Sequence, residues 1–145
     1  MVTISRSALL PYSDAEVFAL VNDIASYPEF MDGCVSAEVL SESEDEIVAR
    51  LELGKVGLRY TFTTRNTLEP PHRMVMHLVE GPFRSFEAQW TFTALAPKAC
   101  KTELQMRFEF SNGLLNMASR MLFESTSREM VSAVSRRAEQ RYGKG

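Results

Sequence analysis

The side chains best suited to acid–base, nucleophilic or metal chemistry are few: two histidines, His72 and His77, and two cysteines, Cys34 and Cys100. A catalytic triad or a metal site needs histidine and carboxylate groups that converge in a pocket. His72 follows Pro70-Pro71 at a predicted turn, and His77 alternates out of phase with the apolar residues beside it. We therefore predict no catalytic residue, no metal site and no enzymatic activity.

The cysteines and glycines also give no indication of a catalytic, metal or phosphate site. Each cysteine begins a predicted strand, and the chain has no CxxC pair that would indicate a redox or zinc site. We interpret both cysteines as packing residues. Gly54 and Gly57 flank a two-residue tip, which is typical of a hairpin rather than of a phosphate-binding loop.

Length and composition are those of one globular domain spanning residues 1–145. The chain is 45% hydrophobic and 24% charged, and this length can bury a single core. No apolar run approaches the ~20 residues that span a bilayer. The first six residues lack the apolar core of a signal peptide, so we expect a cytoplasmic protein.

Turn signals divide the chain into a strand, two short helices, six further strands and a final helix. A capping-box pattern, Ser13 with Glu16, predicts the first short helix, and Pro28 indicates a very short second one over residues 26–30. The predicted strands are Val2–Leu10, Val35–Ser41, Glu46–Leu53, Leu58–Leu68, Arg73–Glu80, Ser85–Ala94 and Cys100–Phe110. Their apolar and polar residues alternate, which predicts an antiparallel sheet with one dry face.

Residues 111–142 are predicted to form one long helix, with Ser111 or Asn112 as its N-cap. At ~1.5 Å per residue its length is ~43 Å, enough to cross a sheet ~30–34 Å wide. Apolar residues recur at helical spacing and predict the face that packs on the sheet. That face comprises Leu115, Ala118, Leu122, Thr126, Met130, Val134, Ala138 and Arg141, widened by Met117, Met121 and Phe123.

The dry face of the sheet carries more large side chains than one helix covers, which favours an apolar tunnel between them. Several of the eight methionines lie on predicted inward faces, and methionine suits a wall that adapts to a flexible guest. A solid core filled by Met and Phe is the alternative that composition leaves open.

The order of elements resembles the helix-grip (START/Bet v 1-like) fold of the START and polyketide-cyclase-like superfamily. This resemblance implies an α+β domain in which a curved, seven-stranded antiparallel sheet wraps around a long C-terminal helix, with two short helices after strand 1. Specific motifs resemble its coenzyme Q-binding protein and ribosome-association toxin branch. They are Tyr27-Pro28-x-Phe30, Gly33-Cys34, Phe62-Thr63-Thr64-Arg65-Asn66, Gly81-Pro82-Phe83, Trp90-x-Phe92 and Phe108-Glu109-Phe110. Met31-Asp32 departs from the Leu-Pro or Val-Pro pair common there.

The resemblance implies non-enzymatic binding of an isoprenoid quinone, most simply ubiquinone held as a ligand rather than as a redox cofactor. Such a carrier or chaperone would support respiration or quinone biosynthesis and would touch a membrane surface transiently. We expect Trp90 to line the pocket, with its indole N–H bonded to a backbone carbonyl or to water. The candidate ligand-binding residues are Tyr27, Phe30, Tyr60, Phe62, Met76, Phe83, Trp90, Phe108, Leu115, Leu122 and Met130.

The same branch implies an alternative of a different class, a ribosome-association toxin that binds the large ribosomal subunit and blocks subunit association. Residues 98–145 carry 9 Lys and Arg against 5 Asp and Glu, whereas residues 1–97 carry 7 against 14. The candidate contacts are Arg128, Arg136, Arg137 and Arg141, with Lys144 beyond them. A third possibility joins the two, with ligand occupancy regulating the contact with the ribosome. A polyketide cyclase- or aromatase-like enzyme is a less favoured alternative, since fold does not fix chemistry. We expect no DNA partner.

Overall fold

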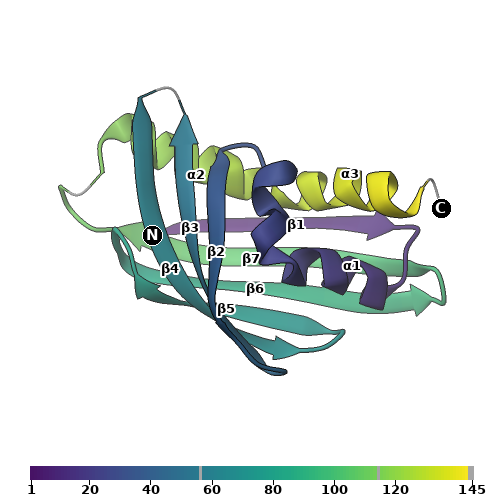
Figure 1. The fold of residues 1–145 in the computed structure, drawn as a ribbon. Coiled ribbons are helices and arrows are strands. Elements are labelled where there is room, and N and C mark those ends of the chain that lie inside the picture. Colours follow the sequence, from purple (N-terminus) through teal and green to yellow (C-terminus); the bar gives the residue numbers. More distant parts are fainter. Residues whose placement is uncertain (56, 114, 144–145) are drawn as a thin grey trace.

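Seven strands form one antiparallel sheet in the computed structural model, which describes residues 1–55, 57–113 and 115–143. The sheet order is β1-β7-β6-β5-β4-β3-β2, so β2 to β7 form a meander and β1 joins its far edge by pairing with β7. The strands are β1 (Val2–Leu10), β2 (Cys34–Glu42), β3 (Glu46–Lys55), β4 (Leu58–Glu69), β5 (Arg73–Glu80), β6 (Phe83–Ala96) and β7 (Ala99–Phe110). The predicted seven-stranded helix-grip architecture is confirmed (Figure 1).

Two short helices follow β1, as predicted. α1 (Asp14–Asn22) begins with the capping box: Ser13 Oγ accepts from the Glu16 N–H at 3.1 Å, and Glu16 Oε1 accepts from the Ser13 N–H at 2.9 Å. The 3₁₀ helix η1 (Ile24–Glu29) contains Pro28. Both lie on the concave side of the curved sheet, beside the C-terminal helices (Figure 1).

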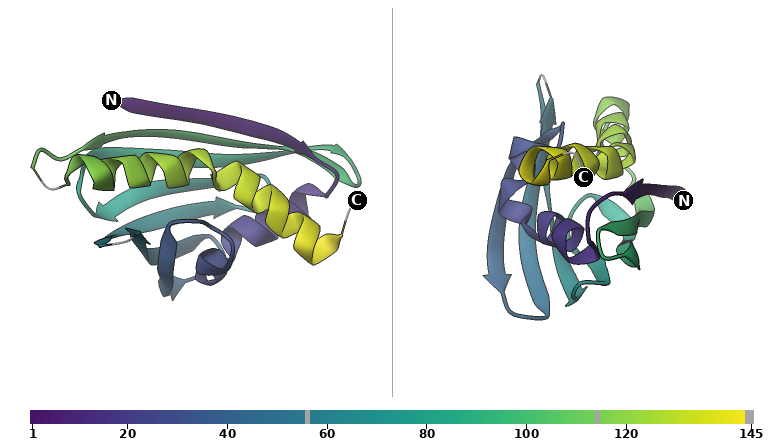
Figure 2. Two further views of the ribbon diagram at one scale, coloured as in Figure 1. Left: turned by 90° about the horizontal axis from the view of Figure 1, so that it is seen from above. Right: turned by 90° about the vertical axis from the view of Figure 1, so that its right-hand side faces the viewer.

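The predicted single helix over residues 111–142 is two helices, α2 (Met117–Arg128) and α3 (Met130–Tyr142). The N-cap is Asn116, whose Oδ1 accepts from the Ser119 N–H at 2.8 Å, and not Ser111 or Asn112. At the junction the Glu129 N–H is shared between the carbonyls of Ser125 and Thr126. Serine and threonine compete with the helix backbone for hydrogen bonds, and the axis changes direction at this point (Figure 2).

Much of the predicted inward face is buried, namely Leu122, Phe123, Met130, Val134 and Ala138. Met117 and Met121, expected to widen the apolar stripe, are 70% and 61% exposed, and Ala118 and Arg141 also face outward. The buried face consists of Ser119, Leu122, Phe123 and Ser127 on α2, and Met130, Val131, Ala133, Val134, Arg137 and Ala138 on α3.

An aromatic cluster fills one half of the core between α2 and the sheet. The Phe123 ring lies 4.8 Å, centroid to centroid, from both Phe83 and Phe108. Phe62, Phe86 and Phe110 complete the cluster around it. Edge-to-face pairs of this kind stabilise beyond their buried area, so this half is solidly packed and the cavity described next lies beside it.

Candidate functional site

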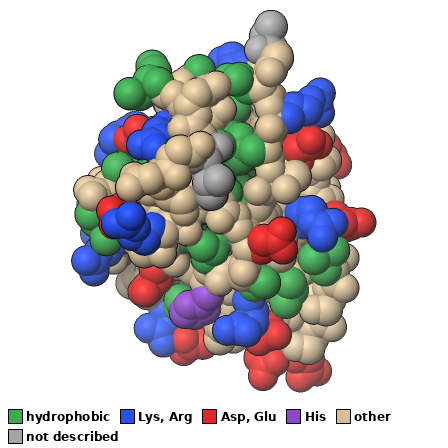
Figure 3. All heavy atoms as spheres, turned by 90° about the vertical axis from the view of Figure 1, so that its left-hand side faces the viewer, with side chains coloured by type: hydrophobic (Ala, Val, Ile, Leu, Met, Phe, Trp, Pro, Cys, Tyr) green, Lys and Arg blue, Asp and Glu red, His purple; other side chains and the backbone are tan. Residues whose placement is uncertain are grey.

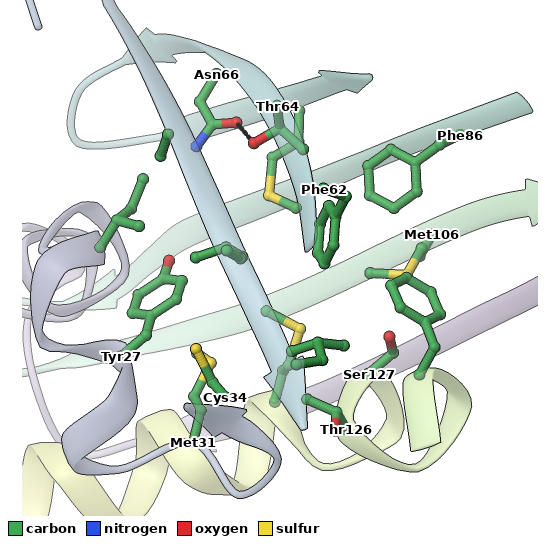
Figure 4. A pocket seen from close by; sticks show the side chains of 17 residues that line it. Tyr27, Met31, Cys34, Phe62, Thr64, Asn66, Phe86, Met106, Thr126 and Ser127 are labelled. Atoms are coloured by element: carbon green, nitrogen blue, oxygen red, sulfur yellow. Dashed lines mark hydrogen bonds between the residues drawn. The ribbon is translucent and has the colours of Figure 1, made fainter. Parts of the chain in front are cut away.

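A cavity of about 40 Å³ lies between the sheet, η1 and the junction of α2 with α3. Its walls come from η1, from strands β2 to β7, and from both C-terminal helices (Figure 4). Since a single water needs ~10–15 Å³ of such space, the cavity as it stands admits a few waters, and a larger guest must displace side chains.

Four of the predicted ligand-binding residues line this cavity: Tyr27, Phe62, Met76 and Met130. Phe30 lies outside it, beside a shallow hollow formed with residues 28–35 and Gly54. Tyr60 donates its hydroxyl hydrogen to the Ser119 carbonyl at 3.3 Å, at the α2 end of the sheet.

The other predicted ligand-binding residues belong to the packed core or to its edge. Phe83 and Phe108 lie in the aromatic cluster, and Leu122 packs close to Gly33, while Leu115 is only partly buried. Trp90 is fully buried and stacks on Phe92, with 6.1 Å between ring centroids. Its placement in the pocket is wrong, because its strand extends beyond the cavity. Among the described residues, no backbone carbonyl accepts a hydrogen bond from its indole nitrogen.

Methionine is the commonest residue in the cavity wall. Met31, Met76, Met106 and Met130 come from the segment after η1, from two strands and from α3. A thioether side chain has three rotatable bonds and refills irregular space at little cost. The wall can therefore be displaced by an apolar guest more easily than one made of branched or aromatic side chains.

Two buried polar side chains from β4 face the cavity, and the sequence interpretation missed both. Thr64 and Asn66 are 3% and 2% exposed, and Thr64 Oγ1 donates to Asn66 Oδ1 at 3.0 Å. Figure 4 shows the pair on the far side of the cavity from Thr126 and Ser127. The alternation that places Phe62 inward continues through both residues, so two polar residues at inward positions were the available signal.

The hydroxyl and thiol groups in the wall are protonated at neutral pH. Burial raises the pKa of the Cys34 thiol to about 11, which leaves it a poor nucleophile. Burial also raises the pKa of the Tyr27 hydroxyl, which donates to the Val21 carbonyl. His72 is exposed, with Nδ1 3.7 Å from Asp14 Oδ2 and away from the cavity wall.

Residues 31–34, which we call the strap, pack against α2 at one side of the cavity. Thr126 Oγ1 donates to the Asp32 carbonyl at 3.2 Å. Gly33 has φ +90°, and a Cβ added there would lie 2.4 Å from Thr126 Oγ1. The position therefore requires glycine both for its backbone conformation and for the close approach to the helix.

Gly33→Ala is expected to lower the free energy of unfolding by about 1–3 kcal/mol more than Gly57→Ala does, because overpacking adds to the backbone strain. Gly57 is the matched control, since it has φ +80° and no atom within 4 Å of an added Cβ. Urea denaturation of both variants measures the difference. Equal losses of unfolding free energy in the two variants would show that residues 31–34 shift to accommodate the added methyl group.

Arg137 is buried, and the prediction that it belongs to an exposed basic strip is wrong. It is 9% exposed, its Nη2 lies 2.9 Å from Glu29 Oε1, and its guanidinium carbon lies 5.1 Å from the Phe30 ring centroid. A cation over an aromatic face and against a carboxylate fixes η1 to α3. Its role in the structure is to hold the cavity wall.

A basic groove runs between edge strand β1 and the α2–α3 junction. Its lining contains three arginines, Arg6, Arg128 and Arg136, against one carboxylate, that of Glu129. Ser7, Ser132 and Ser135 add hydroxyl groups. Figure 2 shows β1 alongside the C-terminal helices. The face of the molecule drawn in Figure 3, by comparison, carries acidic and basic side chains side by side. Two of the four predicted contact arginines, Arg128 and Arg136, thus line the groove together with Arg6. Arg141 lies outside the groove, and Lys144 lies outside the described residues.

Within the described ranges, no three His, Cys, Asp or Glu side chains are grouped so that they could hold a metal ion. None of the helices in those ranges is long and apolar enough to cross a membrane.

The family model described as "Polyketide cyclase / dehydrase and lipid transport" matches residues 10–135. The chain belongs to this family. Its fold is that of the ZhuI aromatase/cyclase from Streptomyces sp. R1128, with a TM-score of 0.82 and 20% identity over 97% of this chain and 94% of that one.

Two of the proteins similar to this chain have names that state a function. The chain is 45% identical to the "Ribosome association toxin RatA" of Vibrio cholerae, covering 99% of each. It is 25% identical to the "Coenzyme Q-binding protein COQ10 homolog B, mitochondrial" of Xenopus laevis, covering 97% of this chain and 59% of that protein. Both relationships match the branch that the sequence motifs resemble.

Proposed function

We propose that this chain binds the large ribosomal subunit and opposes association of the two subunits, without enzymatic activity of its own. The observation that carries the proposal is the 45% identity, over 99% of both chains, with a protein named for ribosome association. A ribosomal partner also implies action in the cytoplasm.

The basic groove supplies the surface that such a partner requires. Ribosomal RNA presents a phosphate backbone, and arginine forks together with hydroxyl groups are the usual protein ligands for phosphate oxygens. The three groove arginines come from β1, α2 and α3, so the fold brings together positive charges that are far apart in the sequence. The chain as a whole has a formal charge of −3, so this concentration of positive charge is local.

The test is binding of the purified protein to purified large subunits, measured by pelleting at several salt concentrations. If the groove contacts phosphates, log K falls linearly with log salt, with a slope of roughly −0.7 to −0.9 per contact. Affinity that does not respond to salt, or no binding at low salt, would contradict the proposal.

The cavity favours a second function, binding of a small apolar molecule such as an isoprenoid quinone. Among the described residues that line it, none is charged and four are methionines. The 25% identity with the coenzyme Q-binding homologue supports the same ligand class. The cavity is about 40 Å³, so a ligand binds only if the methionine side chains move aside. Burial of the ligand's apolar surface offsets the free-energy cost of that movement.

A further inference from the structure

The Thr64–Asn66 pair leaves one strong hydrogen-bonding group without a partner inside the protein. Thr64 donates to the Asn66 amide oxygen at 3.0 Å, which turns the amide nitrogen away from Thr64, toward the side of the cavity where Tyr27 lies (Figure 4). Among the described residues, none accepts a hydrogen bond from this nitrogen. Asn66 as a whole is 2% exposed, and its nitrogen is not one of the fully enclosed unpaired atoms, so it is open to the cavity. Buried amide N–H groups are nearly always paired with protein, water or ligand.

The surroundings restrict what that partner can be. Every other described side chain in the wall is apolar, a thiol or a hydroxyl, and none of these described residues is a lysine, arginine or histidine. A carboxylate taken into this cavity would have no counter-charge, and burying an unpaired charge is strongly unfavourable. The partner of Asn66 is therefore a neutral acceptor.

We propose that the cavity binds an elongated apolar molecule through one neutral carbonyl oxygen, which accepts a hydrogen bond from the Asn66 side-chain amide. Thr64 is the positioning residue, because its hydrogen bond to the amide oxygen aims the nitrogen into the cavity. This inference rests on the second proposed function, ligand binding in the cavity, and names the chemical class: ketones and quinones rather than fatty acids.

A route for the rest of such a molecule lies at the opposite end of the cavity. Met31, Thr126 and Met130 line both the cavity and a polar surface hollow formed with Asp32, Glu129 and Arg136. Displacing the flexible Met31 and Met130 side chains would join the two spaces. The carbonyl end would then sit at Asn66, and the apolar chain would leave between the strap and α2.

The test uses three nine-carbon probes: 2-nonanone, nonane and, at pH 8, nonanoate. Asn66→Leu is expected to weaken binding of 2-nonanone roughly two- to tenfold, the equivalent of one neutral hydrogen bond, and to leave nonane binding unchanged or tighter. Nonanoate should bind the wild type at least about tenfold more weakly than the ketone, because its charge finds no partner. The isosteric Thr64→Val variant should reduce the ketone affinity in the same direction by freeing the amide.

Proton–nitrogen NMR of the wild-type protein gives a readout that does not depend on a variant's folding. The side-chain amide signal of Asn66 should move downfield with 2-nonanone and stay unchanged with nonane. A ketone only accepts hydrogen bonds, so this shift also tests which end of the amide faces the cavity. If both probes bind and the signal does not move, Asn66 does not hold the carbonyl and the inference is overturned. If neither probe binds, ligand binding in the cavity itself is refuted.

Discussion

Reversing two groove arginines, Arg6→Glu with Arg136→Glu, is expected to weaken binding to the large ribosomal subunit about 10- to 100-fold at low salt. Arg6 lies on β1 and Arg136 lies on α3. The loss of affinity in the double variant therefore tests the whole groove and not the C-terminal helix alone. The slope of log K against log salt should become shallower by about 1 for each arginine lost. Pelleting with purified subunits measures both quantities.

The matched control reverses two arginines outside the groove, Arg59 and Arg84. Their side chains are 67% and 61% exposed, and each lies in a surface ion pair, which contributes little to stability. The control has the same net charge as the groove variant, so any difference reports position. If both variants lost the same affinity for the large subunit, the effect would come from overall charge and not from the groove.

Phe123→Ala is expected to lower the free energy of unfolding by about 3–5 kcal/mol, the usual cost of deleting a core phenylalanine. Phe123 is 2% exposed and its ring contacts five other phenylalanines, so little collapse of the site is expected. Urea denaturation gives the loss. Met121→Ala, two residues earlier and 61% exposed, should change stability by less than ~0.5 kcal/mol.

The same variant also enlarges the cavity, because Phe123 is part of its wall. An apolar probe such as nonane should then restore part of the lost stability in proportion to its occupancy. A loss below ~1 kcal/mol would show that the aromatic cluster repacks around the deletion, in contrast to the usual behaviour of well-packed cores.

Strand alternation predicted the sheet well because each strand has one wet and one dry face. The bounds of Val2–Leu10 and Arg73–Glu80 agree with the structure, and Phe86, Ala88, Trp90 and Phe92 are all buried as expected. Inward orientation does not distinguish a cavity wall from packed core. That is why Trp90, Phe83 and Phe108 were expected in the pocket and lie outside it.

The C-terminal helix was harder to predict, because helical spacing shows which residues share a face but not where a helix begins or breaks. The start at Asn116 and the break at Glu129 depend on a side-chain cap and on a shared backbone hydrogen bond. Arg137 shows the same limit. A cation near a helix C-terminus is favourable wherever it points, and only the packing of η1 against α3 shows that it binds Glu29.

Thr64 and Asn66 occupy inward strand positions that the sequence alone indicates, but the predicted ligand-binding residues include only apolar and aromatic side chains. Polar residues at inward strand positions must be paired or must serve a ligand. Arg6 could not be joined to the C-terminal arginines from the sequence, because their proximity arises from the packing of β1 beside α2 and α3.

The most direct test of the central claim is a sucrose-gradient profile of ribosomes mixed with the purified protein at limiting magnesium, where the subunits associate reversibly. The wild-type protein should shift assembled ribosomes toward free large and small subunits in proportion to its concentration, and the Arg6→Glu/Arg136→Glu variant should not. Profiles that stay unchanged at saturating wild-type protein would contradict the account.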